Sequence, residues 1–400
     1  MPPTTREHFI PMRKADLVEK LCHDPAFSAA DAEQFRRLAR LVEATLHFEY
    51  HARLEELKNA YAAFDPDADT RAAEPLTFEQ REECAARLFA SFVSLLERAN
   101  FQKLSREQLV AALEGASDWG VNLAVDLEVF ERLEIFSRGD VIGERSRRRW
   151  WKLWKLETAR LPIYQRLVVI FKLRPGKVNN PNVDTGSVHV KFFKDIPKQD
   201  LEMLLPGTRF QMTRWEKGKI ALPTLSGLAM TVFKIISTAL VLPIWGLLTL
   251  IGGTIGYGVK SYQGYLNTRQ KYQLNLTQSL YYQNLDNNAG VLFRLLDEAE
   301  EQECREALLA YFLLWRESDS GGWDQETLDR AAENWLKEKA DLDVDFEVDD
   351  ALAKLVRLRV VEQPFPERYA AASLETALQR LDEAWDDYFA YNVAEPAESQ

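Results

Sequence analysis

The sequence predicts an α+β protein that is mainly helical. Three observations lead to this fold class: apolar residues at helical spacing near both ends, a central series of short segments rich in β-branched and aromatic residues, and one long uncharged stretch. We therefore expect an N-terminal helical region or layer (1–125), a small basic antiparallel α+β unit (126–222), a transmembrane helical hairpin (223–262) and an acidic, winged-helix-like C-terminal domain (263–400). A length of 400 residues suits two or three domains of roughly 150 residues.

The N-terminal region contains three predicted helices. Apolar residues recur at helical spacing over residues 35–61. A second helix is expected over residues 78–99, because Thr77 and Gln80 form the sequence pattern of a capping box, in which each side chain bonds the backbone N–H of the other. The same pattern recurs at Ser105 and predicts the start of a third helix.

The central region is predicted to form strands. Its short β-rich segments are separated by turn signals such as Pro-Gly and Asn-Asn-Pro. The predicted strands are residues 131–137, 166–173, 188–193, 209–214 and 219–222. A short helix is expected over residues 197–204, between two of the strands.

The uncharged stretch, residues 235–259, predicts a membrane-spanning element. It contains 25 residues, and a helix of that length reaches roughly 37 Å, enough to cross a hydrocarbon core of about 30 Å. Pro243 lies mid-run and favours a break into two short helices, with Lys234 inside the first. Gly252 and Gly256 form a small-xxx-small pair that lets helices approach closely. A buried helix of a soluble core is the less favoured alternative.

The charge pattern predicts the orientation of this hairpin. The formal net charge is −12, but residues 138–220 carry 19 basic and 8 acidic side chains, while residues 291–400 carry 11 basic and 28 acidic ones. Basic residues flank the uncharged stretch on both sides, and positive charge favours the cytoplasmic side. We therefore expect both termini on the cytoplasmic face of a bacterial inner membrane, since no signal peptide or Arg-rich presequence is evident. A single span remains the alternative.

A cluster of basic and tryptophan residues precedes the membrane segment. Its members are Arg147, Arg148, Arg149, Trp150, Trp151, Lys152, Trp154 and Lys155. Tryptophan favours the headgroup boundary, and clustered cations attract anionic lipid headgroups. The cluster therefore predicts a membrane interface, although an ordinary strand with solvated charges, or a nucleic-acid surface, could have the same composition.

The C-terminal region has the element order of a winged helix. Helices are expected over residues 291–315, 325–339 and 349–358, followed by a hairpin over 360–371 and a last helix over 374–391. DNA recognition needs a basic surface, and this region is strongly acidic. It is therefore expected to bind protein, by self-association or to a partner, and no nucleic-acid partner is expected.

One group of side chains could hold a metal ion. Glu43, His47, His51 and Glu55 are spaced by four and line one helical stripe. A surface helix of alternating charge has the same pattern. Cys22, Cys84 and Cys304 are too few and too scattered for a disulfide framework or a cysteine-rich zinc site.

Several stretches together resemble a known family. They are Arg6–Pro11 (REHFIP), Phe35–Asp65, Phe193–Pro197 (FKDIP) with Leu201–Gly207, and Leu280–Asn284 (LYYQN) through Trp315. The combination resembles the domain-of-unknown-function 3754 family, which includes the eukaryotic transmembrane protein 143 group. The resemblance implies a membrane protein with a pair of hydrophobic segments, and it brings no activity, catalytic residue or cofactor.

The sequence therefore favours a membrane-anchored, non-enzymatic interaction or scaffold protein. A metal-dependent enzyme that uses the Glu/His stripe is the first alternative. An oligomeric pore or transport component, suggested by Lys234 and the membrane glycines, is the second.

Overall fold

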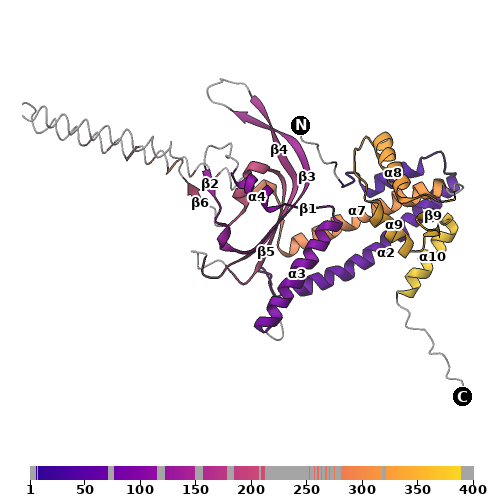
Figure 1. The fold of residues 1–400 in the computed structure, drawn as a ribbon, viewed down its shortest axis with the longest axis horizontal. Helices are drawn as coiled ribbons and strands as arrows, with labels where there is room; N and C mark the ends of the chain where they lie inside the picture. Colours follow the sequence, from indigo (N-terminus) through magenta and orange to yellow (C-terminus); the bar gives the residue numbers. More distant parts are fainter. Residues whose placement is uncertain are drawn as a thin grey trace, which may run out of the picture.

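The computed structural model is a mixed α+β fold with a small antiparallel sheet, which confirms the predicted class at that level. It describes residues 6, 8–70, 76–114, 122–148, 156–177, 184–206, 209–211, 281–317 and 321–388, with scattered helical positions between 252 and 274. The C-terminal helices gather at one end, the sheet lies toward the other with further helices beside it, and two long helices run between them (Figure 1).

The N-terminal part forms four helices. They are α1 (Lys14–Cys22), α2 (Ala29–Tyr61), α3 (Phe78–Arg98) and α4 (Arg106–Glu114). The predicted capping box opens α3, since the Thr77 side chain accepts from the backbone N–H of Gln80 and the Gln80 side chain accepts from that of Thr77. Both reciprocal bonds also form between Ser105 and Gln108 before α4.

Five strands form the main sheet, in the order β1-β3-β4-β5-β7, and every pairing is antiparallel. Their bounds are β1 (Gln102–Lys103), β3 (Phe130–Arg148), β4 (Leu156–Leu173), β5 (Val188–Pro197) and β7 (Asn284–Asn287). A separate two-stranded ribbon pairs β2 (Asn122–Ala124) with β6 (Arg209–Gln211), and two 3-10 helices complete the unit, η1 (Leu127–Val129) and η2 (Lys198–Leu204).

The central unit differs from the sequence prediction in its details. The short helix expected over residues 197–204 is a 3-10 helix, η2. The strand β7 was not among the predicted strands, and it pairs with β5. The predicted strand over 219–222 lies outside the described residues.

The C-terminal part contains four helices and a hairpin. They are α7 (Ala289–Arg316), α8 (Gln325–Ala340), α9 (Val348–Arg357), β8 (Val361–Phe365), β9 (Arg368–Ala371) and α10 (Leu374–Asp387). The predicted order of helices and hairpin is therefore present from α7 to α10. A winged helix as a three-dimensional arrangement remains a prediction.

Three hydrophobic cores organise the described residues. The helical core joins α1 and the first half of α2 to the second half of α7 and to α8–α10. The junction core joins the second half of α2, α3 and the first half of α7 to one face of the sheet. The third core lies on the opposite face of the sheet, against η2. Alternation along β4 explains the two faces, because Val168 and Ile170 enter the junction core while Leu167, Val169 and Phe171 enter the third core.

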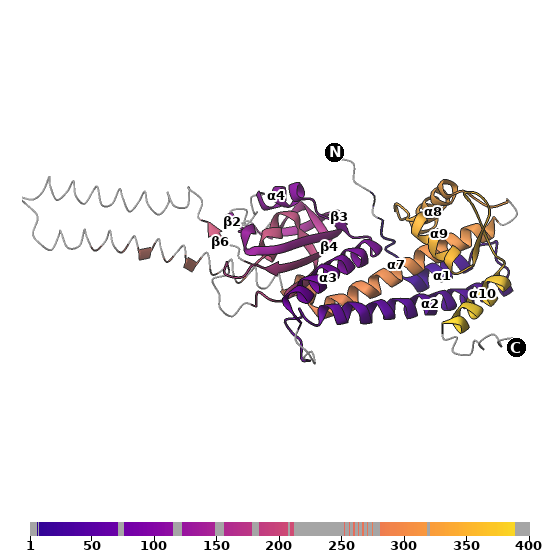
Figure 2. The same cartoon turned by 60° about the horizontal axis from the view of Figure 1, so that its bottom comes forward.

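The helices α2 and α7 connect the two ends of the molecule. They lie side by side along its long axis in both views (Figures 1 and 2). Each contributes to the helical core and to the junction core. The N-terminal and C-terminal parts of the chain therefore share their cores.

Within the part of the chain that the structure describes, no helix combines the length and apolar character that crossing a membrane requires. Most of the uncharged stretch, including Lys234 and Pro243, lies outside those residues. Gly252 and Gly256 are described as helical and exposed. Among the described residues, no atom lies within 4 Å of where a Cβ would be at either glycine.

Candidate functional site

The helix α7 carries a layer of buried polar side chains between the two cores that it joins. Gln302, Glu303, Arg305 and Glu306 are each at most 6% exposed. The residues of α7 before them enter the junction core and those after them enter the helical core. Burying charged groups costs free energy unless hydrogen-bond or ion-pair partners satisfy them, so these side chains should have partners nearby.

Partners from several elements satisfy the two carboxylates of the layer. Glu303 accepts from Arg98 Nη1 of α3 at 3.0 Å, and Lys354 Nζ of α9 lies 3.5 Å from its Oε1. Glu306 accepts from Gln302 Nε2 at 2.7 Å, and Lys354 Nζ lies 3.6 Å from it. The layer therefore links α3, α7 and α9 through charge.

An N-terminal strap, residues 8–12, crosses the same layer. The Ile10 N–H donates to Gln302 Oε1 at 3.2 Å. Arg305 Nη1 donates to the Met12 carbonyl at 2.8 Å. Asn100 Nδ2 donates to the His8 carbonyl at 2.7 Å. These bonds hold the strap against α7 and satisfy part of the buried polar layer.

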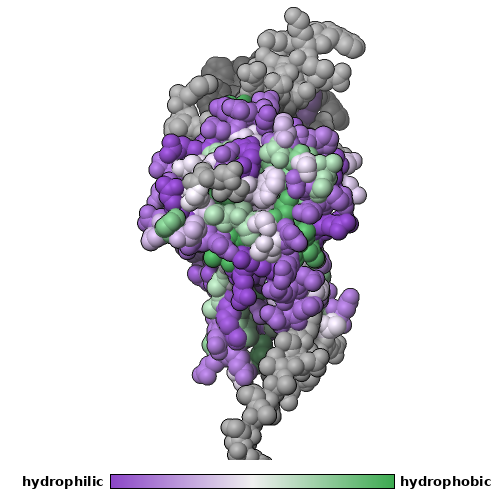
Figure 3. Space-filling model, turned by 90° about the vertical axis from the view of Figure 1, so that its right-hand side faces the viewer, coloured by the Kyte–Doolittle hydropathy of each residue, from purple (hydrophilic) through white to green (hydrophobic). Residues whose placement is uncertain are grey.

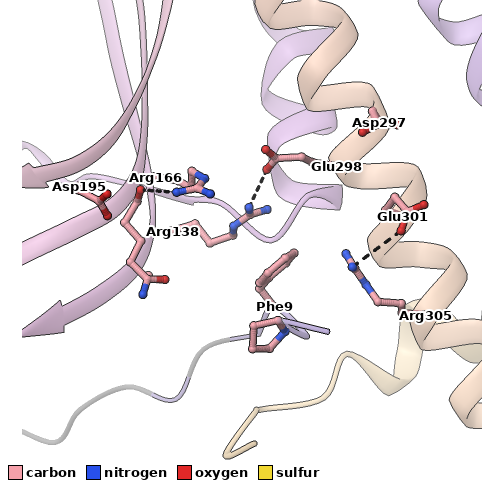
Figure 4. Close-up of a pocket in the computed structure, with 11 residues that line it drawn as sticks. Phe9, Arg138, Arg166, Asp195, Asp297, Glu298, Glu301 and Arg305 are labelled. Carbon is pink, nitrogen blue, oxygen red and sulfur yellow. Dashed lines mark hydrogen bonds and ion pairs between the residues drawn. The ribbon is translucent and has the colours of Figure 1, made fainter. Parts of the chain in front are cut away.

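A cavity of about 440 Å³ opens between this strap, α7 and the sheet. This volume lies within the range of roughly 300–1,000 Å³ that is typical of small-molecule sites. Figure 4 shows the side chains that line it, and they come from segments far apart in the sequence. The lining residues are Phe9, Pro11, Arg138, Gly139, Gln165, Arg166, Asp195, Asp297, Glu298, Glu301 and Arg305.

Arg138 forms the inner wall of the cavity. Its Nη1 donates to the Ala99 carbonyl at 2.9 Å, and its Nη2 donates to Glu298 at 2.6 Å. Its guanidinium carbon lies 3.9 Å from the centre of the Phe9 ring and 4.6 Å from that of Phe101. Burial lowers the pKa of Arg138, and the positive charges of Arg166 and Arg305 also act to lower it. Three guanidinium groups thus lie within electrostatic reach of one another.

Two positions of the sheet that line the cavity have positive φ. Gly139 of β3 has a φ of +78°, and Asp195 of β5 has a φ of 52°. Residues other than glycine rarely adopt a positive φ. Both flank Gln165 of β4, whose side chain would lie within 2.5 Å of a Cβ at position 139. Glycine at position 139 therefore allows the Gln165 side chain to lie close against β3.

Part of the cavity falls in a segment with a family match. Residues 164–290 match the model of a family described as a protein of unknown function, DUF3754. Residues 164–290 belong to the DUF3754 family. This finding confirms the resemblance seen in the sequence, whereas the narrower likeness to transmembrane protein 143 stays a prediction. No solved structure matches the chain.

The DUF3754 segment supplies Gln165, Arg166 and Asp195 to the cavity. The strap and α7 supply the other side, from the stretches REHFIP and residues 280–315 that also carried the resemblance. Sequence reasoning did not pick out this cavity, because nothing in the linear order shows that these stretches meet. All of these stretches carried the family resemblance, and that was the sequence signal that could have linked them to one site.

The Glu/His stripe lies on α2, and its members pair with different partners. Glu43 binds Lys14 Nζ at 2.5 Å, His47 Nδ1 lies 3.0 Å from Glu300, and Glu55 binds Lys58 at 2.7 Å. His51 is exposed. In the described part of the chain, no three His, Cys, Asp or Glu side chains form a group that could hold a metal ion. These contacts give the predicted metal site no support.

The predicted membrane-interface cluster begins at the end of the β3–β4 hairpin. Arg147 and Arg148 are the last residues of β3, and they pair in register with Glu157 and Leu156 of β4. Arg149, Trp150, Trp151, Lys152, Trp154 and Lys155 lie outside the described residues. The cluster therefore spans the end of β3 and the residues between β3 and β4.

Proposed function

We propose that this DUF3754 protein is a membrane-anchored, non-enzymatic interaction protein, held on the cytoplasmic face of a bacterial inner membrane by a helical hairpin. In this proposal residues 223–262 are the anchor. The remainder of the chain stays together on one side as a scaffold.

The observation that carries the proposal is the shared helical core. The N-terminal helices α1 and α2 and the C-terminal helices α8–α10 bury their apolar residues against one another and α7. One core cannot be divided by a bilayer, so the parts of the chain before and after the uncharged stretch lie on the same side. A segment between them that enters a membrane must then cross it an even number of times, and 40 residues suffice for two short helices.

The strand pairing around the uncharged stretch supports the same topology. β5 precedes the stretch and β7 follows it, and the two strands pair antiparallel through Lys191 with Asn287 and Phe192 with Asp286. Gln283 Nε2 also donates to the Asp195 carbonyl at 2.8 Å. The chain thus leaves and rejoins the same sheet, as an inserted hairpin would.

Two surfaces would contact partners in this proposal. The basic connection of the β3–β4 hairpin would contact anionic lipid headgroups. The acidic C-terminal part, with its winged-helix-like order of elements, would bind a protein partner or a second copy of the chain. The molecular face that carries this part is mainly hydrophilic, with smaller hydrophobic areas (Figure 3), which favours a polar contact.

Cysteine labelling in bacterial cells tests the topology. In a Cys84→Ser background, where the remaining Cys22 and Cys304 are buried, single cysteines are placed at Ser91, Pro243 and Glu383. We expect a membrane-impermeant maleimide added to intact cells to label position 243 alone, and permeabilisation to expose positions 91 and 383. In reconstituted protein, quenching of tryptophan fluorescence by brominated phosphatidylglycerol checks the headgroup contact.

Two results would contradict the proposal. Labelling of positions 91 and 383 from opposite sides would mean an odd number of crossings. Complete release of the protein from membranes by alkaline carbonate would mean that the uncharged stretch does not anchor it. The Cys84→Ser parent without an added cysteine is the matched control for background labelling.

A further inference from the structure

Most of the helical positions that the structure describes between residues 252 and 283 lie on one face. At about 100° per residue, the angular step of an α-helix, they fall within an arc of about 80°. We call this set the seam, and its members are Gly252, Gly256, Val259, Gln263, Leu266, Gln270, Leu274 and Tyr281. Leu266 is half-buried and the others are exposed, so the seam is an open surface of the described structure.

Beyond residue 262, where the proposed anchor ends, the seam exposes apolar side chains. Leu274 is 60% exposed and Tyr281 is 77% exposed. From Val259 to Tyr281, the large apolar members of the seam recur every seven or eight residues. A helix presents the same face to a neighbouring helix after every two turns, so this spacing is typical of a contact between two helices.

The composition of the seam favours an identical partner. The charged residues between positions 252 and 283 are Lys260, Arg269 and Lys271, and their spacing places all three outside the arc. Two copies can therefore meet along the seam without opposing like charges. Gln263 and Gln270 are its polar members, and an amide side chain both donates and accepts. Each glutamine can therefore bond the same residue of an identical helix.

The part of the seam within the proposed anchor carries a different helix-contact signal. Gly252 and Gly256 are four residues apart, and small residues at this spacing let two helices approach closely in a bilayer. The glycine pair lies on the same face as Leu274 and Tyr281. One partner helix can therefore contact both parts of the seam.

We propose that the seam is the interface between two copies of this chain, whose helices pack side by side and parallel. The proposal rests on the proposed anchor, because copies inserted in one membrane with the same topology present the seam in the same direction and at the same depth. A two-fold axis along the membrane normal then places each seam residue against its equivalent. Glycine meets glycine within the bilayer, and leucine and glutamine layers alternate beyond it.

Disulfide crosslinking of the full-length protein in native membranes tests the interface. In the Cys84→Ser background, where Cys22 and Cys304 are buried, Gln270→Cys places a thiol on the seam. Tyr282→Cys is the matched control, because Tyr282 is also exposed and lies about 120° from the centre of the seam. We expect oxidation to link most Gln270→Cys chains into covalent dimers and few Tyr282→Cys chains.

A charge on the seam should separate the two copies. Leu274→Lys, added to the Gln270→Cys protein, opposes two cations and should slow dimer linking at least about fivefold. Tyr282→Lys adds the same charge off the seam and should leave the rate nearly unchanged. Equal thermal unfolding midpoints of these two variants show that the comparison concerns association.

Three results would overturn the proposal. They are absence of linked dimers in Gln270→Cys, equal linking of Gln270→Cys and Tyr282→Cys, and linking that Leu274→Lys does not slow. The same crosslinking in detergent-purified protein does not depend on how often the chain crosses the membrane. Failure of the seam is therefore distinguishable from failure of the proposed topology, which maleimide labelling reports.

Discussion

At the scale of single residues, the burial of Glu306 makes the stability of the fold depend on pH. It is 2% exposed, and burial raises its pKa to about 7, although Lys354 and the bonds from Gln302 and Asn100 act in the opposite direction. The pKa in the folded state thus lies above the ordinary value of 4.5. A raised pKa means that the protonated carboxyl contributes stability that is fully present below about pH 4.5 and is lost as the pH rises through about 7.

The first prediction concerns the substitution Glu306→Gln. Glutamine resembles the protonated carboxyl and does not ionise, so the variant should gain stability relative to the wild type as the pH rises from about 5 to about 8. The relative gain should be about 2 kcal/mol, since one pKa unit corresponds to about 1.4 kcal/mol. Urea unfolding at several pH values measures it. Glu83→Gln, an exposed control, should show no such trend; a parallel pH profile in both variants would contradict the raised pKa.

At the scale of elements, the helices begin where side chains satisfy free backbone N–H groups. The long α2 begins at Ser28, whose side chain forms a capping box with Asp31, and α3 begins with the box of Thr77 and Gln80. The first N–H groups of a helix lack partners within it, so such bonds fix the starting residue. This local chemistry explains why the starts of α3 and α4 could be predicted from sequence.

The second prediction concerns the start of α3. Thr77→Ala removes the acceptor for the Gln80 N–H and should lower the free energy of unfolding by about 1 kcal/mol. Ser91→Ala is the control, because Ser91 is exposed in the middle of the same helix and caps nothing. Chemical denaturation of both variants decides it. Equal stabilities of the two variants would show that the capping box contributes nothing measurable.

At the scale of the whole molecule, α7 makes the two cores depend on each other. Leu292 of α7 is buried in the junction core, and Leu308 of the same helix is buried in the helical core. The strap and the polar layer add bonds between them. Because one continuous helix carries both cores, the loss of either core removes packing from the other.

The third prediction follows from this shared helix. Leu292→Ala and Leu308→Ala should each lower the free energy of unfolding by about 2–5 kcal/mol and should each shift one common transition. Leu76→Ala, at an exposed position, should leave the transition nearly unchanged. Tryptophan fluorescence, which includes buried Trp335 of the helical core, is compared with far-UV circular dichroism. Two separated transitions in either core variant would show that the cores unfold independently.

The sequence by itself determined the local features of this protein. The α+β class, the helix starts at Thr77 and Ser105, and the parts of β3, β4 and β5 within residues 131–137, 166–173 and 188–193 follow from neighbouring residues. Capping bonds and alternation along a strand depend on short spacings. The resemblance to the DUF3754 family, also read from the sequence, is confirmed over residues 164–290.

Tertiary structure decided which distant segments meet. The Glu/His stripe shares one face of α2, as its spacing predicts. Yet Glu43 pairs with Lys14 of α1, and His47 pairs with Glu300 of α7. The spacing within the stripe does not indicate either of these partners. The cavity likewise needs Phe9 of the strap, Arg166 of β4 and Arg305 of α7 together. The burial of Glu303 and Glu306, and the partners of their carboxylates, depend on how α2, α3, α7 and α9 pack. The spacing of residues along the sequence does not reveal that packing.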